Sequence, residues 1–200
     1  MFKIAVLVSG SGTNLQSIID NINNKKLDCT LEAVIGDRDC FGVSRAIEAG
    51  IDSYTLNRKV LKTNLCREID KIVSNKKIDL IILAGFLSII DEEFVKKWKG
   101  KIINIHPSLL PKYGGTGMYG IKVHEAVLKG NESESGCTVH FVDTGVDSGE
   151  IIEQIKVPVL ENDTAEILQK RVLVQEHILL PKAIEKIIKE SKGVCQWKEH

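Results

Sequence analysis

The first half of the chain alternates short apolar runs with segments in which apolar residues recur every three or four positions. Apolar runs of this length predict buried strands, and the three-to-four spacing predicts amphipathic helices. The predicted strands span residues 3–8, 31–35, 53–56, 79–83 and 102–105, and the predicted helices follow the turn at 9–14 and span 43–49, 63–75 and 91–97. This alternation indicates a mostly parallel, doubly wound sheet of the Rossmann-like α/β class.

The second half of the chain departs from this alternation. After a predicted helix at residues 122–128, runs at 137–142 and 150–157 flank a polar, glycine-containing loop, which is typical of an antiparallel hairpin. Thr164 is suited to cap a closing helix, which we expect to be interrupted or kinked at Pro181. The sequence contains no internal repeat and no linker, so we predict a single domain over residues 1–200.

Composition bears on the partners and on the cellular compartment. Lys and Arg together number 27, as do Asp and Glu, so no overall charge favours nucleic acid or a membrane surface, and we expect small-molecule partners. The longest strongly apolar run, residues 80–87, is far shorter than the about 20 residues that span a bilayer. Five scattered cysteines without a CxxC pair argue against a disulfide framework and favour a cytoplasmic protein. The sequence leaves open whether it is a monomer or a homodimer.

A glycine-rich turn, Gly10-Ser-Gly12-Thr13-Asn14, joins the first predicted strand to the first helix. Glycines let the backbone approach a ligand closely, and the free N–H groups at a helix start favour an anion. The turn lacks the Lys-Ser/Thr ending of a Walker A loop, and Leu15 stands where the dinucleotide pattern has its third glycine. The functional interpretation is a phosphate cradle for something smaller than a dinucleotide, and the alternative is a tight turn without a ligand.

Asn104 and His106 lie two residues apart at the end of a predicted strand, so their side chains point to the same face. Pro107 then ends the strand. An amide can donate a hydrogen bond to a developing oxyanion, and a neighbouring imidazole can accept or relay a proton near pH 7. We expect a catalytic pair, with a buried pair that only satisfies loop backbone groups as the alternative.

Two carboxylates, Asp143 and Asp147, lie on the loop of the predicted hairpin. Either can hold an imidazolium such as that of His106, raise its pKa and fix its tautomer, and the spacing does not choose between them. The alternative for each is a turn aspartate that bonds its own backbone. The histidines show neither an HExxH motif nor paired metal-ligand spacing, so we expect no metal site.

Longer stretches around these motifs carry a family resemblance. They read Leu-Ala-Gly-Phe at residues 83–86, Asn-Ile-His-Pro-Ser-Leu-Leu-Pro-Lys-Tyr at 104–113 and Asp-Ser-Gly at 147–149, and together they resemble the folate-dependent formyltransferases. The glycine turn is similar to that of the members acting on glycinamide ribonucleotide. The resemblance implies transfer of a formyl group from 10-formyltetrahydrofolate, as co-substrate, to the primary amine of glycinamide ribonucleotide in de novo purine synthesis, by direct attack through a tetrahedral intermediate.

The resemblance also implies roles for individual residues. Residues from 1 to about 105 would form a phosphate-binding parallel half, and those from about 106 to 200 a half with the folate loop and the hairpin. The catalytic residues would be Asn104, His106 and Asp147, a choice between the two aspartates that the spacing alone did not make. The ribonucleotide would contact Gly12, Thr13, Asn14 and Glu176. The folate would contact Lys62, Leu87, Ser88, Ile89, Ile90, Asn104, His140 and Asp143.

The main alternative is a formyltetrahydrofolate hydrolase, which shares the catalytic residues but sends the formyl group to water. Hydrolases of the family carry an additional N-terminal regulatory domain, whereas the first predicted strand here begins at residue 3, so we expect the transferase. Three positions depart from the family pattern. The loop at residues 113–120 is longer and richer in glycine than in some relatives, Ser88 replaces a basic residue, and Leu173 replaces a polar residue.

Overall fold

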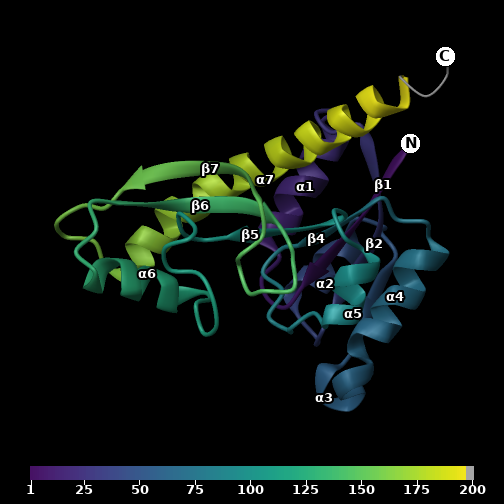
Figure 1. The fold of residues 1–200 in the computed structure, drawn as a ribbon, viewed down its shortest axis with the longest axis horizontal. Helices are drawn as coiled ribbons and strands as arrows, with labels where there is room; N and C mark the ends of the chain where they lie inside the picture. The colour runs from purple at the N-terminus through teal and green to yellow at the C-terminus, as the bar shows by residue number, and fades with distance from the viewer. Residues whose placement is uncertain (197–200) are drawn as a thin grey trace.

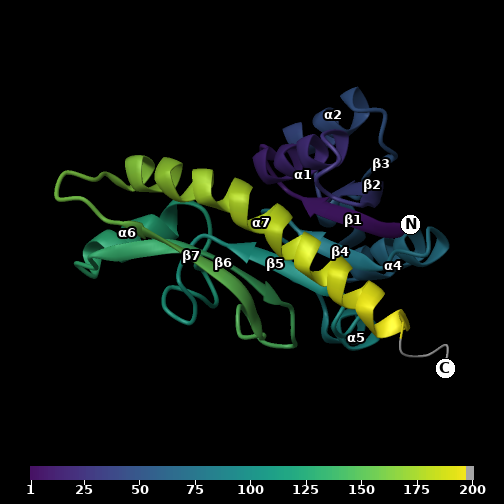
Figure 2. The ribbon, with the colours of Figure 1, turned by 90° about the horizontal axis from the view of Figure 1, so that it is seen from above.

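The computed structural model describes residues 1–196, which form one seven-stranded sheet with helices on both faces (Figures 1 and 2). The strand order is β3-β2-β1-β4-β5-β6-β7. The strands are β1 (Phe2–Val8), β2 (Cys29–Gly36), β3 (Ser53–Thr55), β4 (Leu80–Leu83), β5 (Ile102–His106), β6 (Glu134–Phe141) and β7 (Ile151–Pro158). The first five strands pair in parallel, and β6 pairs antiparallel with both β5 and β7. The predicted Rossmann-like α/β class with an antiparallel hairpin is confirmed.

The two faces of the sheet are covered by different helices. Strand β1 shows the division, since Ile4 and Val6 pack into one apolar cluster while Ala5 and Leu7 pack into the other. The first cluster includes side chains of α1 (Thr13–Asn23), α2 (Phe41–Glu48), α6 (Ile121–Lys129) and α7 (Ala165–Gln196). The second includes side chains of α4 (Leu65–Asn75) and α5 (Glu92–Lys97). Burial on both faces explains why the parallel strands are continuous apolar runs.

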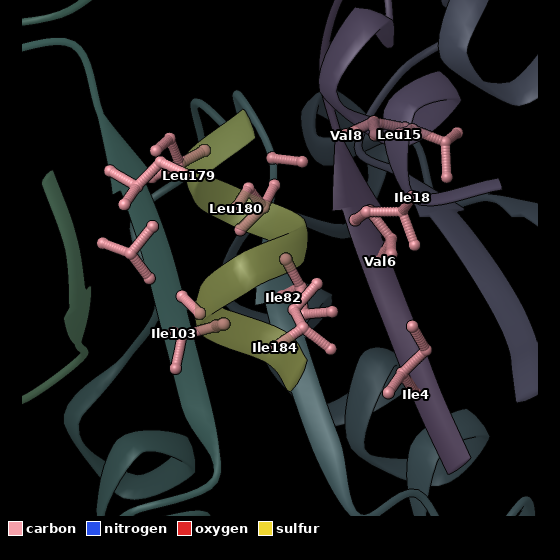
Figure 3. Close-up of a cluster of buried hydrophobic side chains, with 14 of the residues drawn as sticks. Ile4, Val6, Val8, Leu15, Ile18, Ile82, Ile103, Leu179, Leu180 and Ile184 are labelled. Atoms are coloured by element: carbon pink, nitrogen blue, oxygen red, sulfur yellow. The ribbon is translucent and has the colours of Figure 1, made fainter. Parts of the chain in front are cut away.

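The closing helix α7 continues through Pro181 without a break, so of the predicted interruption or kink at Pro181 the interruption is wrong. Proline costs about 3 kcal/mol inside a helix because it removes a backbone donor and crowds the preceding turn. The neighbouring Leu180 and Ile184 are fully buried between α7 and the sheet (Figure 3). Burial of each such side chain contributes roughly 1.5–3 kcal/mol, so the packing of α7 offsets the cost of the proline.

Two short elements and one pairing were not predicted. Helix α3 (Arg58–Leu61) and the 3-10 helix η1 (Lys62–Asn64) contain no buried residue, so no apolar periodicity marked them. The antiparallel pairing of β5 with β6 joins strands that are separated by a long loop and α6, which local patterns do not connect.

Within residues 1–196, no helix is both long enough and apolar enough to cross a membrane.

Candidate active site

A cleft of about 820 Å³ opens where the parallel strands β1, β4 and β5 end. This volume lies in the roughly 300–1,000 Å³ range of small-molecule sites, and the carboxyl ends of parallel strands are the usual place for such sites. The walls come from the turn at 10–14, the segments at 83–90 and 104–107, the loops at 115–120 and 142–147, and the side of α7 that carries Gln169, Leu173 and Glu176. The cleft therefore collects residues from both halves of the chain.

The glycine turn holds the start of α1 at the wall of the cleft. Gly12 adopts a left-handed conformation, with φ of 70°, directly before the helix. A Cβ at Gly12 would lie 2.5 Å from the Cα of Gly42 on α2, and the Gly42 N–H donates to the Gly10 carbonyl at 3.0 Å. The first turn of α1 contains no acidic residue. The backbone N–H groups and the helix dipole at this helix start are of the kind that favours an anion.

Two of the residues predicted to contact the ribonucleotide are bonded to each other. The Asn14 side chain donates from Nδ2 to Glu176 Oε2 at 2.6 Å and so joins α1 to α7. Glu176 is only 8% exposed, and burial raises the pKa of its carboxyl above the ordinary range although the Asn14 bond acts in the opposite direction. The Asn14 Oδ1 atom is buried and has no hydrogen-bond partner among residues 1–196, so it is an acceptor that a ligand can satisfy.

The antiparallel register of β5 and β6 places Asn104 directly opposite His140. Asn104 Nδ2 lies 3.1 Å from His140 Nε2 and donates to Asp147 Oδ1 at 3.4 Å. His140 Nδ1 lies 2.8 Å from the Phe141 carbonyl, which can only accept. The proton of a neutral His140 is therefore on Nδ1, and Nε2 accepts from Asn104. His140 fixes the orientation of the Asn104 amide.

His106 is 4% exposed and has a partner on each side of its ring. Its Nε2 lies 2.8 Å from the Tyr113 carbonyl and so carries a proton. Its Nδ1 lies 3.5 Å from Asp147 Oδ2, which is longer than a normal hydrogen bond. Burial lowers the pKa of His106, although Asp147 and the Tyr113 carbonyl act in the opposite direction. At neutral pH the ring is thus uncharged, with an Nδ1 lone pair that can take a proton beside a carboxylate.

Asp147 is the carboxylate that the fold brings to the strand end. Its backbone has φ of 56°, which is uncommon for a residue other than glycine, and its Oδ2 accepts from the Gly115 N–H at 3.0 Å. Burial opposes ionisation, but the neighbouring imidazoles of His140 and His106 and the Gly115 N–H together hold the pKa of Asp147 below its usual range. Asp143 instead accepts from the Gly145 N–H and the Ser148 hydroxyl within its own loop.

The residues predicted to contact the folate divide between two cavities. The segment 87–90 and the predicted residues Asn104, His140 and Asp143 all line the cleft. Lys62 does not, and it lines a neighbouring cavity of about 750 Å³. Ser88 and Ile89 belong to the walls of both cavities. The structure thus brings every predicted site residue together in the cleft except Lys62, which lines only the neighbouring cavity.

The sequence analysis did not identify some residues that lie in the site or close to it. The Tyr113 carbonyl and the Gly115 N–H act through the backbone, which leaves no signature in side-chain identity. His124 is buried and lines the cleft, where burial and the nearby His106 ring both lower its pKa. Asp37 follows β2 and is fully buried, and the strand-end argument that identified Asn104 would have identified it as well. No cluster of three potential metal-binding side chains occurs in the described range.

Comparison with known proteins places this site in a family. A profile described as formyl transferase matches residues 2–184, so the chain belongs to the formyl transferase family. The chain is 40% identical over 189 residues to the phosphoribosylglycinamide formyltransferase of Escherichia coli (strain K12), a match that covers 91% of this chain and 85% of that protein. It is 43% identical over 188 residues to the trifunctional purine biosynthetic protein adenosine-3 of Chironomus tentans.

The match to the Chironomus protein covers 91% of this chain, which spans only 13% of the length of that relative. A solved structure shows the same fold. The crystal structure of glycinamide ribonucleotide transformylase 1 from Symbiobacterium toebii has a TM-score of 0.86 and 38% sequence identity, and the match covers 92% of this chain and 86% of that chain.

Replacement of Gly12 by alanine tests the steric fit of the turn. We expect Gly12→Ala to lower the free energy of unfolding by roughly 1–3 kcal/mol, because the added methyl meets the Gly42 backbone and the left-handed conformation is strained. Gly10→Ala is the matched control, since a Cβ there meets no atom within 4 Å. Denaturant unfolding measures both variants, and equal losses in the two would contradict the fit.

The buried His124 predicts a dependence of stability on pH. Burial lowers its pKa from 6.5 to about 4. The unfolded chain therefore gains this proton near pH 6.5 and the folded chain only near pH 4, so stability is lost as the pH falls through this window, by up to roughly 3 kcal/mol. We expect the unfolding free energy of His124→Asn to fall less than that of the wild type between pH 7 and pH 4. Parallel profiles from denaturant titrations would show that His124 does not contribute.

Proposed function

We propose that this chain transfers the formyl group of 10-formyltetrahydrofolate to the primary amine of glycinamide ribonucleotide, a step of purine synthesis. One observation carries the proposal: the same cleft contains a helix start that favours an anion and the side chains of Asn104, His106 and Asp147. A substrate with a phosphate at one end and an amine at the other matches this arrangement. The relatives described above, one a phosphoribosylglycinamide formyltransferase and one a purine biosynthetic protein, support the same substrate.

The Asn104 amide stabilises the charge that develops on the formyl oxygen. When the amine attacks the formyl carbon, a C–N bond forms and the carbonyl electrons move to oxygen. Asn104 Nδ2 carries two protons, one held by His140 and one that reaches Asp147 Oδ1 only at 3.4 Å. The second proton is free to turn to the oxyanion, and the first keeps the amide in place. A donor that is already oriented contributes without reorganisation cost.

His106 and Asp147 move the proton that the reaction must transfer. The attacking amine becomes an ammonium group in the tetrahedral intermediate and loses a proton, which His106 accepts at Nδ1. The resulting imidazolium lies against Asp147, whose negative charge balances it. The proton then passes to the folate nitrogen as its bond to the formyl carbon breaks. Alignment of two substrates in one cleft supplies a further large part of the acceleration.

The two substrates would occupy different walls of the cleft. We assign the ribonucleotide to Gly12, Thr13, Asn14 and Glu176, supported by the helix start and by the unpartnered Asn14 Oδ1. We assign the folate to the wall at 87–90 with Asn104, His140 and Asp143, and Lys62 would contact only a part that extends past Ser88 into the neighbouring cavity. The division into a phosphate-binding half and a folate half, the monomer or homodimer state and the cytoplasmic location remain part of the proposal.

A transfer assay tests the function. Purified protein is supplied with 10-formyltetrahydrofolate, with and without glycinamide ribonucleotide, and the formylated ribonucleotide, tetrahydrofolate and formate are measured. We expect one formylated product per folate consumed and no reaction without the ribonucleotide. Formate release in both reactions would support the hydrolase, and binding of the ribonucleotide without turnover would reject an enzymatic function.

Replacement of Asp147 by asparagine tests the proton route. Asparagine keeps the shape but cannot balance a charged His106, so we expect kcat to fall by about 10²–10⁴-fold with little change in the KM of the ribonucleotide. Asp143→Asn is the comparison, because Asp143 bonds its own loop, and its kcat should fall far less. If the two variants have the same kcat, the assignment of Asp147 is wrong.

A further inference from the structure

A buried carboxylate lies behind the folate wall of the cleft, outside the cleft itself. Asp37 follows β2 and is fully buried. Arg38 donates from Nε to Oδ1 at 2.8 Å and from its terminal nitrogen to Oδ2 at 3.0 Å, and Arg58 lies 3.8 Å from Oδ2. Burial of an isolated carboxylate charge costs free energy, and the two guanidinium groups compensate that cost here. Asp37 is therefore an ionised and firmly held acceptor.

The Ser88 hydroxyl donates a hydrogen bond to this carboxylate. Its Oγ donates to Asp37 Oδ2 at 2.6 Å, which is short, as expected for a bond to a charged acceptor. A serine hydroxyl has one proton, so while this bond persists Ser88 can accept from a ligand in the cleft but cannot donate to it. Ser88 therefore tethers its segment to Asp37.

The segment at 85–88 is held at two further points, both on Ser9. The Ser9 backbone N–H donates to the Gly85 carbonyl at 3.2 Å, and the Leu87 N–H donates to Ser9 Oγ at 2.8 Å. Phe86 and Ile90 pack against the second apolar cluster, whereas Leu87 is 44% exposed and Ile89 is 85% exposed. Between these two apolar contacts, hydrogen bonds to Ser9 and Asp37 hold the segment at Leu87 and Ser88.

We infer that Asp37 and Ser9 are positioning residues for the folate substrate, which they serve by holding the segment 85–90 against the cleft through Ser88 and Leu87. Neither residue lines the cleft, and each acts through the wall that it holds. The inference rests on the proposed function for the identity of the substrate. A wall that is already in place lowers the ordering cost of binding, so its loosening should weaken folate binding without changing the chemical step.

Ser88→Ala is the first test, because it removes the tether and leaves the pairing of Asp37 with Arg38 intact. We expect the KM for 10-formyltetrahydrofolate to rise about tenfold, while kcat and the KM for the ribonucleotide stay within about twofold of the wild type. Ser88→Thr, which keeps a hydroxyl, should restore most of the folate affinity. A rise in the KM of both substrates together would overturn the inference.

Ser74→Ala is the matched control. The Ser74 hydroxyl also donates to a carboxylate that is paired with a cation, since it lies 3.3 Å from Asp70, which binds Lys97. Ser74 lies on α4 and lines neither cavity. The kinetics of Ser74→Ala should equal those of the wild type. Equal folate KM values for Ser88→Ala and Ser74→Ala would overturn the inference.

Backbone amide exchange of residues 85–90, followed by mass spectrometry, tests the tether independently of activity. We expect faster exchange in Ser88→Ala and in Asp37→Asn than in the wild type, and no change in Ser74→Ala. Unchanged exchange in Ser88→Ala would overturn the tether even if transfer is normal. Faster exchange in a protein that transfers no formyl group would instead support the tether and reject the proposed function, so the two failures can be told apart.

Discussion

The antiparallel pairing of β5 with β6 is the constraint on which the site depends. Parallel strands bring their carboxyl ends to one edge of the sheet, and this places Asn104 and His106 at the end of β5. Because β6 runs in the opposite direction, Asn104 stands beside His140, and β6 ends beside the start of β5, where Phe141 pairs with Ile103. The loop that follows β6 turns back over the sheet, and on it Asp147 meets His106.

Burial sets the charge state of each group at this edge, and neighbours then modify it. His106 is kept neutral because burial lowers its pKa, while Asp147 is kept ionised because two imidazoles and a backbone N–H outweigh its burial. Burial instead raises the pKa of Glu176, farther along the cleft, because it outweighs the hydrogen bond from Asn14. Titratable groups whose environments drive their pKa values apart are typical of acid–base sites.

The two walls of the cleft are held by different kinds of force. The turn at the start of α1 is fixed by sterics, since Gly12 contacts the Gly42 backbone too closely to admit a side chain. The segment at 85–90 is held by hydrogen bonds to Ser9 and Asp37 and by the packing of Phe86 and Ile90 against the second apolar cluster. One wall therefore resists change through backbone contact, and the other depends on two polar side chains as well as on apolar packing.

Local patterns in the sequence determined the parallel half of the fold, the glycine turn and the placement of Asn104 beside His106, because each depends on residues that are close along the chain. Only the tertiary structure placed Asp147, and not Asp143, beside His106, carried α7 through Pro181 and revealed Asp37 behind the segment at 85–90. Those outcomes depend on contacts between distant segments. A periodicity records which face of an element is apolar, and it does not record which partner that element meets.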